Sequence, residues 1–130
     1  MGKQLICLFL LSLLVLNSNC DGGHSNDVEY FIRNGLNNRI SWNAFYLDSG
    51  GFSSEIILDS DGLDFTGGGG ILDGDSVLFV NKATNDTIIY RNLRHGEDIS
   101  PSNHFYNTRS WVEEEYNKFY YTVREEDFNQ

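Results

Sequence analysis

From Val28 onward the chain consists of short runs in which apolar and polar residues alternate, separated by residues that favour turns. In the first run one face carries Val28, Tyr30 and Ile32 and the other carries Glu29, Phe31 and Arg33. This period of two is typical of a β-strand. Further strands are predicted at residues 40–47, 55–58, 63–66, 77–80, 87–90 and 119–123.

Turn residues separate these runs. Asn34-Gly35 favours a tight turn because both residues tolerate positive φ, and Asp48–Gly51, Asp59–Gly62 and Asp73–Asp75 are similar in composition. Residues 91–108 show little periodicity and are predicted to form a long loop. Residues 110–113 fit either a helix capping box or the start of a strand, and their β-rich surroundings favour a strand.

The pattern predicts one all-β domain over residues 28–130, an antiparallel β-sandwich of about seven strands that is immunoglobulin-like or jelly-roll-like. Residues 77–80 are apolar throughout. This predicts a strand that is covered on both faces.

The N-terminus has a different pattern. An apolar run over residues 5–16 follows a short head that carries Lys3, and the run is too short to cross a bilayer comfortably, which takes about 20 residues. A charged head, a short apolar stretch and a small polar exit describe an export signal. Residues 1–19 are therefore predicted to be a signal peptide, and residues 20–27 a lipidated cysteine with a flexible tether.

The junction at Leu16–Gly23 resembles a bacterial lipobox, in which a cysteine becomes the lipidated first residue of the mature protein. Here Cys20 is that cysteine, although Asn17 and Asn19 stand where the pattern has leucine and a small residue. No cysteine follows Cys20, so it has no downstream disulfide partner. The alternatives are ordinary signal removal, which would release a soluble secreted protein, and an uncleaved anchor.

The net charge of the chain disfavours two classes of binding partner. The chain has a formal net charge of −10, which argues against nucleic acid as a partner, because phosphate contacts need a concentrated positive surface. The same charge disfavours adhesion to anionic lipid headgroups. The expected link to the membrane is the lipid on Cys20, and no cofactor is predicted.

Both ends of the chain resemble small uncharacterised lipoproteins of the Bacteroidetes type. The resemblance rests on the exit segment, the opening strand at 28–34, a late tryptophan, and the ending Phe119–Phe128 with its Tyr-Thr-Val-Arg-Glu-Glu-Asp-Phe sequence. It implies a lipid-anchored β-sandwich in the bacterial cell envelope, as an outer-membrane lipoprotein that faces the periplasm or the exterior. It implies no activity.

Three segments partly match catalytic motifs, and each falls short of what the chemistry needs. Asp48–Gly51 resembles a serine-protease loop, but only His24, His95 and His104 could act as its base, and His24 lies in the predicted tether. Gly67–Gly70 lacks the lysine and helix of a phosphate loop. Glu113–Glu115 are adjacent, whereas glycoside hydrolysis needs two carboxylates on opposite sides of a sugar. The chain is therefore predicted not to be an enzyme.

Metal and modification sites remain as minor candidates. Oxygen ligands suit calcium, and the aspartates dense enough to supply them are Asp59, Asp61, Asp64, Asp73 and Asp75. His95, Glu97, Asp98 and His104 share the long loop and are zinc-type ligands without distinctive spacing. Asp-Ser/Thr-apolar triplets at Ser76 and Thr87 resemble a bacterial O-glycosylation signal, and Asn85 begins an N-glycosylation triplet.

These observations predict a lipid-anchored envelope protein that acts as a non-catalytic binding or structural module. A carbohydrate-binding surface module is the alternative, because planar aromatic side chains with polar tips suit sugar rings. The candidate aromatic residues are Trp42, Tyr106, Trp111, Tyr116, Tyr120 and Tyr121. A row of them exposed on one sheet would favour sugar binding, and burial of all six would exclude it.

Overall fold

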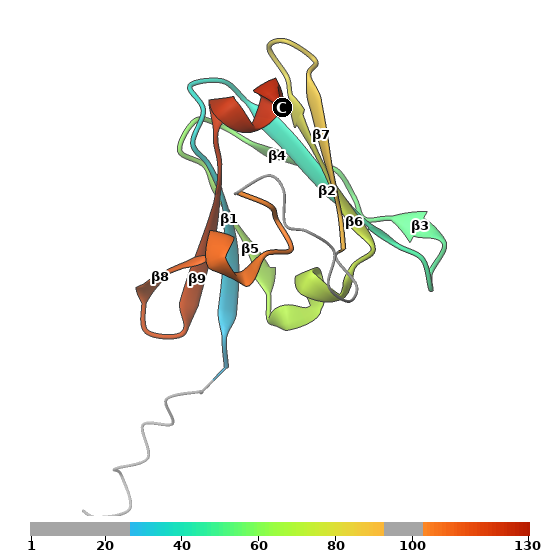
Figure 1. Ribbon diagram of the computed structural model, residues 1–130, viewed down its shortest axis with the longest axis vertical. Helices are drawn as coiled ribbons and strands as arrows, with labels where there is room; N and C mark the ends of the chain where they lie inside the picture. Colours follow the sequence, from blue (N-terminus) through green and yellow to red (C-terminus); the bar gives the residue numbers. More distant parts are fainter. Residues whose placement is uncertain (1–26, 93–102) are drawn as a thin grey trace, which may run out of the picture.

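Two β-sheets pack face to face in the computed structural model, which describes residues 27–92 and 103–130 (Figure 1). The strands are β1 (Glu29–Asn34), β2 (Ile40–Tyr46), β3 (Gly51–Phe52), β4 (Ile56–Leu58), β5 (Leu63–Gly67), β6 (Ser76–Asn81), β7 (Thr87–Arg91), β8 (Val112–Glu115) and β9 (Lys118–Val123). Three 3₁₀ turns complete the described chain: η1 (Gly69–Asp73), η2 (Thr108–Ser110) and η3 (Glu125–Asn129). The predicted β-sandwich is confirmed.

One sheet has four strands in the order β5-β1-β9-β8, and the other has five, in the order β3-β2-β6-β7 with β4 also on β2. All neighbours are antiparallel except β1 and β9, which run parallel from Glu29↔Lys118 to Asn34↔Val123. The expectation of a wholly antiparallel sandwich is therefore wrong at this pair. Because β1 and β9 are the first and last strands, the four-stranded sheet forms only when both ends of the domain have joined it.

Asn34 ends β1 as a buried side chain rather than as an exposed turn residue, with 0% of its surface exposed. Its Nδ2 donates to the carbonyls of Asn38, Leu58 and Asp59 at 2.7, 3.1 and 3.0 Å, and its Oδ1 accepts from the Leu36 amide at 2.9 Å. One side chain thus joins the β1–β2 connection to the β4–β5 turn.

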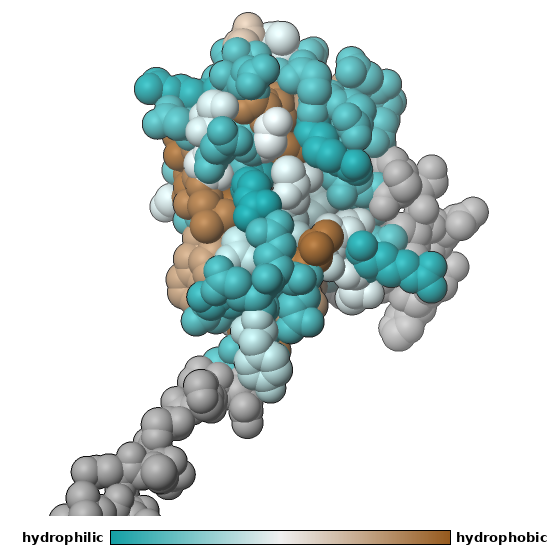
Figure 2. Space-filling view, turned by 90° about the vertical axis from the view of Figure 1, so that its left-hand side faces the viewer, coloured by the Kyte–Doolittle hydropathy of each residue, from teal (hydrophilic) through white to brown (hydrophobic). Residues whose placement is uncertain are grey.

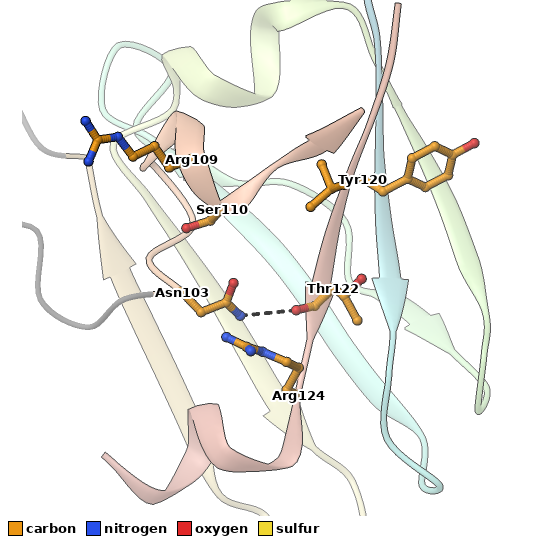
Figure 3. Close-up of a pocket in the computed structure, with 7 residues that line it drawn as sticks. Asn103, Arg109, Ser110, Tyr120, Thr122 and Arg124 are labelled. Atoms are coloured by element: carbon orange, nitrogen blue, oxygen red, sulfur yellow. Dashed lines mark hydrogen bonds between the residues drawn. The ribbon is translucent and has the colours of Figure 1, made fainter. Parts of the chain in front are cut away.

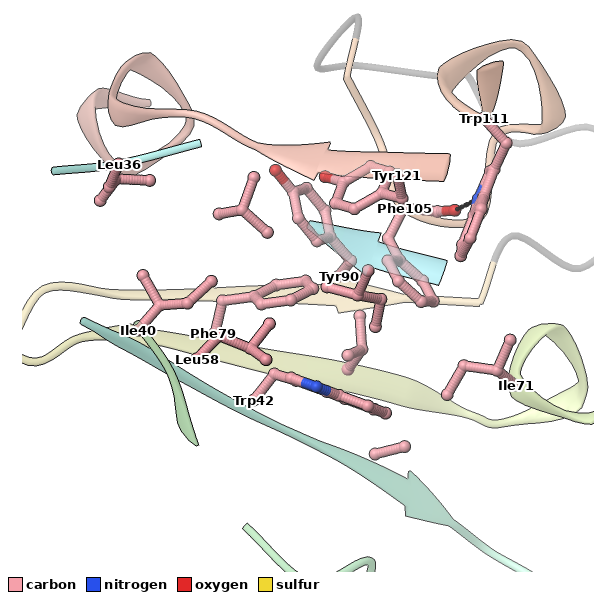
Figure 4. Packing of buried hydrophobic residues seen from close by; sticks show 14 residues of the cluster. Leu36, Ile40, Trp42, Leu58, Ile71, Phe79, Tyr90, Phe105, Trp111 and Tyr121 are labelled. Carbon is pink, nitrogen blue, oxygen red and sulfur yellow. Dashed lines mark hydrogen bonds between the residues drawn. The ribbon is translucent and has the colours of Figure 1, made fainter. Parts of the chain in front are cut away.

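The core lies between the sheets and is rich in aromatic rings, which interleave from both sides (Figure 4). At its centre the Tyr121 ring of β9 lies 5.9 Å from Phe79 of β6 and 5.0 Å from Phe105. Trp111 closes one end, and its Nε1 donates to the Phe105 carbonyl at 2.7 Å. Buried rings of this kind contribute about 150–250 Å² of covered surface each, which lets a small domain hold a stable core.

Two local predictions have different outcomes. Residues 110–113 do lead into a strand, β8, after the short turn η2. The expectation that residues 77–80 are covered on both faces is wrong: Val77 and Phe79 are buried, whereas Leu78 and Val80 are half-buried on the outer face. The apolar side chains there cover the outside of the five-stranded sheet, and no second layer covers them within the described residues.

The predicted signal peptide, tether and Cys20 lie outside the described residues, as do His95, Glu97 and Asp98 of the long loop. Within residues 27–92 and 103–130 there is no helix of sufficient length and hydrophobicity to cross a bilayer.

Candidate functional site

Three aromatic rings cross the outer face of the four-stranded sheet. Phe65 of β5 pairs with Phe31 of β1, and Phe31 pairs in turn with Tyr120 of β9. The Phe31 ring lies 5.3 Å from Phe65 and 4.9 Å from Tyr120, where the planes are 13° apart. We call these three residues the aromatic row.

The three side chains of the aromatic row differ in how much of their surface is exposed. Phe65 is 57% exposed, Phe31 is half-buried and Tyr120 is only 7% exposed. Leu63, 47% exposed, lies on the same edge strand as Phe65, and Figure 2, which faces this sheet, shows hydrophobic surface beside polar side chains. The open end of the row is therefore an apolar shelf on β5 and β1, and Tyr120 closes the other end.

Arg33 and Glu114 form an ion pair beside the aromatic row. Its two terminal nitrogens donate to the two carboxylate oxygens of Glu114 at 2.7 Å each, and its guanidinium carbon lies 4.8 Å from the centre of the Tyr120 ring. Bidentate pairing and cation–π contact both hold the guanidinium in one orientation. The hydrogen bond to Arg33 lowers the pKa of Glu114, and the same contact raises the pKa of Arg33.

A hollow lies beside β9 where its partner strand ends. β8 pairs with β9 only as far as Val112↔Tyr120, so the β9 edge beyond Tyr120 has no strand neighbour on that side. The Asn103 amide donates to the Thr122 carbonyl there at 3.2 Å (Figure 3). The hollow has a volume of about 370 Å³ and is lined by Asn103, Arg109, Ser110, Val112, Tyr120, Thr122 and Arg124. We call it the arginine hollow.

The aromatic row and the arginine hollow meet at Tyr120. In Figure 3 its ring extends away from the hollow, over β1, while Arg109 and Arg124 lie on the opposite side of β9. Positive charge is scarce in a chain with nine Lys and Arg against nineteen Asp and Glu. Three of those cations nevertheless lie at these two neighbouring regions: Arg33 at the aromatic row, and Arg109 and Arg124 in the arginine hollow.

A second cavity, about 300 Å³, lies between β7 and the C-terminal turn η3. Asp127, 1% exposed, lines it and accepts hydrogen bonds from the Asn103 amide and the Arg124 main-chain amide, both at 2.8 Å. His104, 5% exposed, packs 4.9 Å from the Tyr90 ring. Burial raises the pKa of Asp127 and lowers the pKa of His104. Asn103 thus joins η3, and His104 joins β7, to the same short segment, so we assign this polar cluster a structural role.

The structure does not gather the calcium candidates. Asp59 pairs with Arg39 at 2.6 Å, Asp75 accepts from the Leu47 amide, and Asp64 faces inward with a buried oxygen. Asp61 occupies a left-handed turn with φ 58°, and Asp73 ends η1. Among the described residues no three His, Cys, Asp or Glu side chains are placed to hold a metal.

The other candidates also stand apart. Ser49 of the protease-like loop donates to the Tyr46 carbonyl at 3.1 Å, and the glycine run leads into the turn η1 rather than a helix. Glu113 accepts from the Asn117 amide, and Glu115 pairs with Lys118. Of the glycosylation candidates, Thr87 is exposed at the start of β7 and Ser76 is half-buried at the start of β6.

The six aromatic residues proposed for sugar binding do not form one exposed row. Trp42, Trp111 and Tyr121 are buried in the core, Tyr106 is half-buried, and Tyr116 is 78% exposed by itself on the β8–β9 turn. Only Tyr120 belongs to the aromatic row. Phe31 and Phe65 were missed, although Phe31 stands on the otherwise polar face of the first predicted strand, which is the signal that could have found it.

Comparison with protein-family models, with curated proteins and with solved structures gives no match for this chain.

Proposed function

We propose that this chain is a lipid-anchored, non-catalytic binding module of the bacterial cell envelope, and that the outer face of its four-stranded sheet binds the ligand. The observation that carries the binding role is the aromatic row, held beside a fixed Arg33–Glu114 pair. Large apolar side chains left exposed beside oriented polar groups are typical of recognition surfaces.

The outer face of the five-stranded sheet is the weaker candidate. Its exposed apolar residues are dispersed: Phe52 lies on β3 beside Phe45, while Ile57 and Ile89 lie on β4 and β7. The strands β2 and β6 separate Ile57 from Ile89 in the sheet order. No stack of three rings forms there among the described residues.

Carbohydrate is the ligand class that this surface favours. The faces of sugar rings pack on aromatic side chains, and their hydroxyl groups need oriented donors and acceptors nearby. The aromatic row supplies the first and the Arg33–Glu114 pair the second. A chain that extends from a membrane into the envelope would meet such ligands directly.

Ligand binding is tested with Phe31→Ser and Phe65→Ser on an array of bacterial and host oligosaccharides. Each ring removed is expected to weaken binding about two- to twelvefold, from ~0.5–1.5 kcal/mol of stacking. The matched control is Phe52→Ser, which removes a ring that is 65% exposed on the other sheet. Equal loss in all three variants, or no glycan bound by the unaltered protein, would contradict the carbohydrate assignment.

The anchor is tested separately by palmitate labelling in bacterial cells. Cys20→Ala is expected to abolish incorporation, and Cys7→Ala, which changes the only other cysteine, is expected to leave it intact. Label that persists in the Cys20 variant would exclude lipidation at this position and favour a soluble secreted protein.

A further inference from the structure

We propose that the ligand is an acidic glycan, and that the arginine hollow binds the carboxylate of one of its sugars while the aromatic row packs against a neighbouring ring. This inference rests on the proposed carbohydrate-binding function and names the class of sugar. It follows from the composition of the hollow, which differs from that of the chain as a whole.

The hollow carries charge of one sign. Arg109 and Arg124 both line it, and no carboxylate does so among the described lining residues. The two lining arginines contrast with the net charge of −10 of the whole chain. Guanidinium groups bind carboxylates through paired, charge-assisted hydrogen bonds, which makes a sugar carboxylate the complementary group.

The two arginines differ in the ion pairs that they already form. Arg109 follows the Asn107 cap of η2, is exposed, and forms no ion pair with another described residue. Arg124 is held from below: one terminal nitrogen lies 3.1 Å from Glu126, the other 3.8 Å from Asp127. The buried Nε of Arg124 has no hydrogen-bond partner among the described residues. We therefore expect the Arg109 guanidinium to bind the sugar carboxylate directly, and the guanidinium of Arg124 to contribute positive charge from a fixed position.

Ser110 and Thr122 also line the hollow. In Figure 3 the Ser110 side chain lies on the same side of β9 as the two arginines, whereas the Thr122 side chain points to the other side, as Tyr120 does. The volume of about 370 Å³ is within the range of small-molecule sites. Tyr120 belongs to the aromatic row and also lines the hollow, so the oligosaccharide must be long enough to pass around β9 from one side of Tyr120 to the other.

The test uses oligosaccharides that contain glucuronate, galacturonate or sialate, each beside its carboxyl-reduced counterpart, which removes the charge and keeps the sugar. We expect at least one acidic ligand to bind about tenfold or more tightly than its reduced form, the value of a lost charged hydrogen bond. Binding should also weaken with added salt.

Arg109→Gln should remove that preference without lowering the melting temperature. Arg39→Gln is the matched control: it deletes the same charge at an exposed arginine that does not line the hollow. If acidic and reduced ligands bind equally, or if Arg109→Gln and Arg39→Gln behave alike, the acidic-glycan inference fails while carbohydrate binding stands. If neither form of any sugar binds, both fail.

Discussion

Replacing Asn34 by alanine should be among the most damaging single changes at any polar residue of the domain. The side chain makes one accepted and three donated contacts, all with main-chain groups. Its amide has only two protons, so two full donated bonds and one accepted bond are lost. Each bond contributes about 0.5–1.5 kcal/mol, and the buried carbonyls left unpaired add a further penalty. The free energy of unfolding is therefore expected to fall by ~3–4 kcal/mol.

Asn81 provides the matched comparison. It is equally buried, at 0% exposure, and its Oδ1 accepts from the amide two residues on, at Ala83, as Asn34 does from Leu36. Its Nδ2, however, has no hydrogen-bond partner among the described residues. Asn81→Ala should therefore cost only about 1 kcal/mol, the value of one hydrogen bond.

The difference, about 2–3 kcal/mol, corresponds to a melting temperature roughly 10–20 °C lower for Asn34→Ala than for Asn81→Ala. Urea denaturation followed by tryptophan fluorescence reports it, because Trp42 and Trp111 are both buried. Equal destabilisation by the two variants would show that the three donated contacts contribute nothing, and that Asn34 does not join the two turns as described.

Two further predictions concern the core. Burial raises the pKa of the inward-facing Asp64 carboxyl, with the Trp42 indole acting in the opposite direction. Its stabilising contribution is therefore present below pH 3.8, its ordinary pKa, and is lost as pH rises through the raised folded-state value. The Asp64→Asn variant should therefore have a higher melting temperature than the unaltered protein at pH 7, and the two melting temperatures should converge near pH 3.5. A difference in melting temperature that does not change between these pH values would refute the raised pKa of Asp64. Tyr121→Phe removes a buried hydroxyl that donates to the Asn103 carbonyl at 2.7 Å, and should cost ~1–2 kcal/mol in urea denaturation. An unchanged midpoint would mean that this bond does not hold the chain after the long loop.

Local rules predicted most of the strands because alternation and turn residues act over a few positions. The opening alternation, the Asp59–Gly62 turn and the final strand all fall close to their predicted positions. The parallel pairing of β1 with β9 could not be predicted this way, since it joins segments almost ninety residues apart and depends on the order of strands in the sheet.

The proposed binding surface could not be predicted from the sequence, for the same reason. Phe31, Phe65 and Tyr120 become neighbours only when three strands distant in sequence are placed side by side. Residue type alone points to tryptophan and tyrosine as sugar-binding candidates, but Trp42 and Tyr121 face inward because of their place in the alternation. In β1 the alternation itself is informative, because it predicts that Phe31 and Arg33 share one face, which the structure shows to be the outer one.

The most direct test of the account is to map the ligand on the protein surface by NMR. A sugar selected on the array is titrated into isotopically labelled protein, and amide shifts are followed along the strands. Changes are expected to concentrate on β1, β5 and β9 around Phe31, Phe65 and Tyr120, and to continue to Thr122 and Arg124. Changes centred on Phe52 and Ile89, on the outer face of the opposite sheet, would contradict the proposal that the four-stranded sheet binds the ligand.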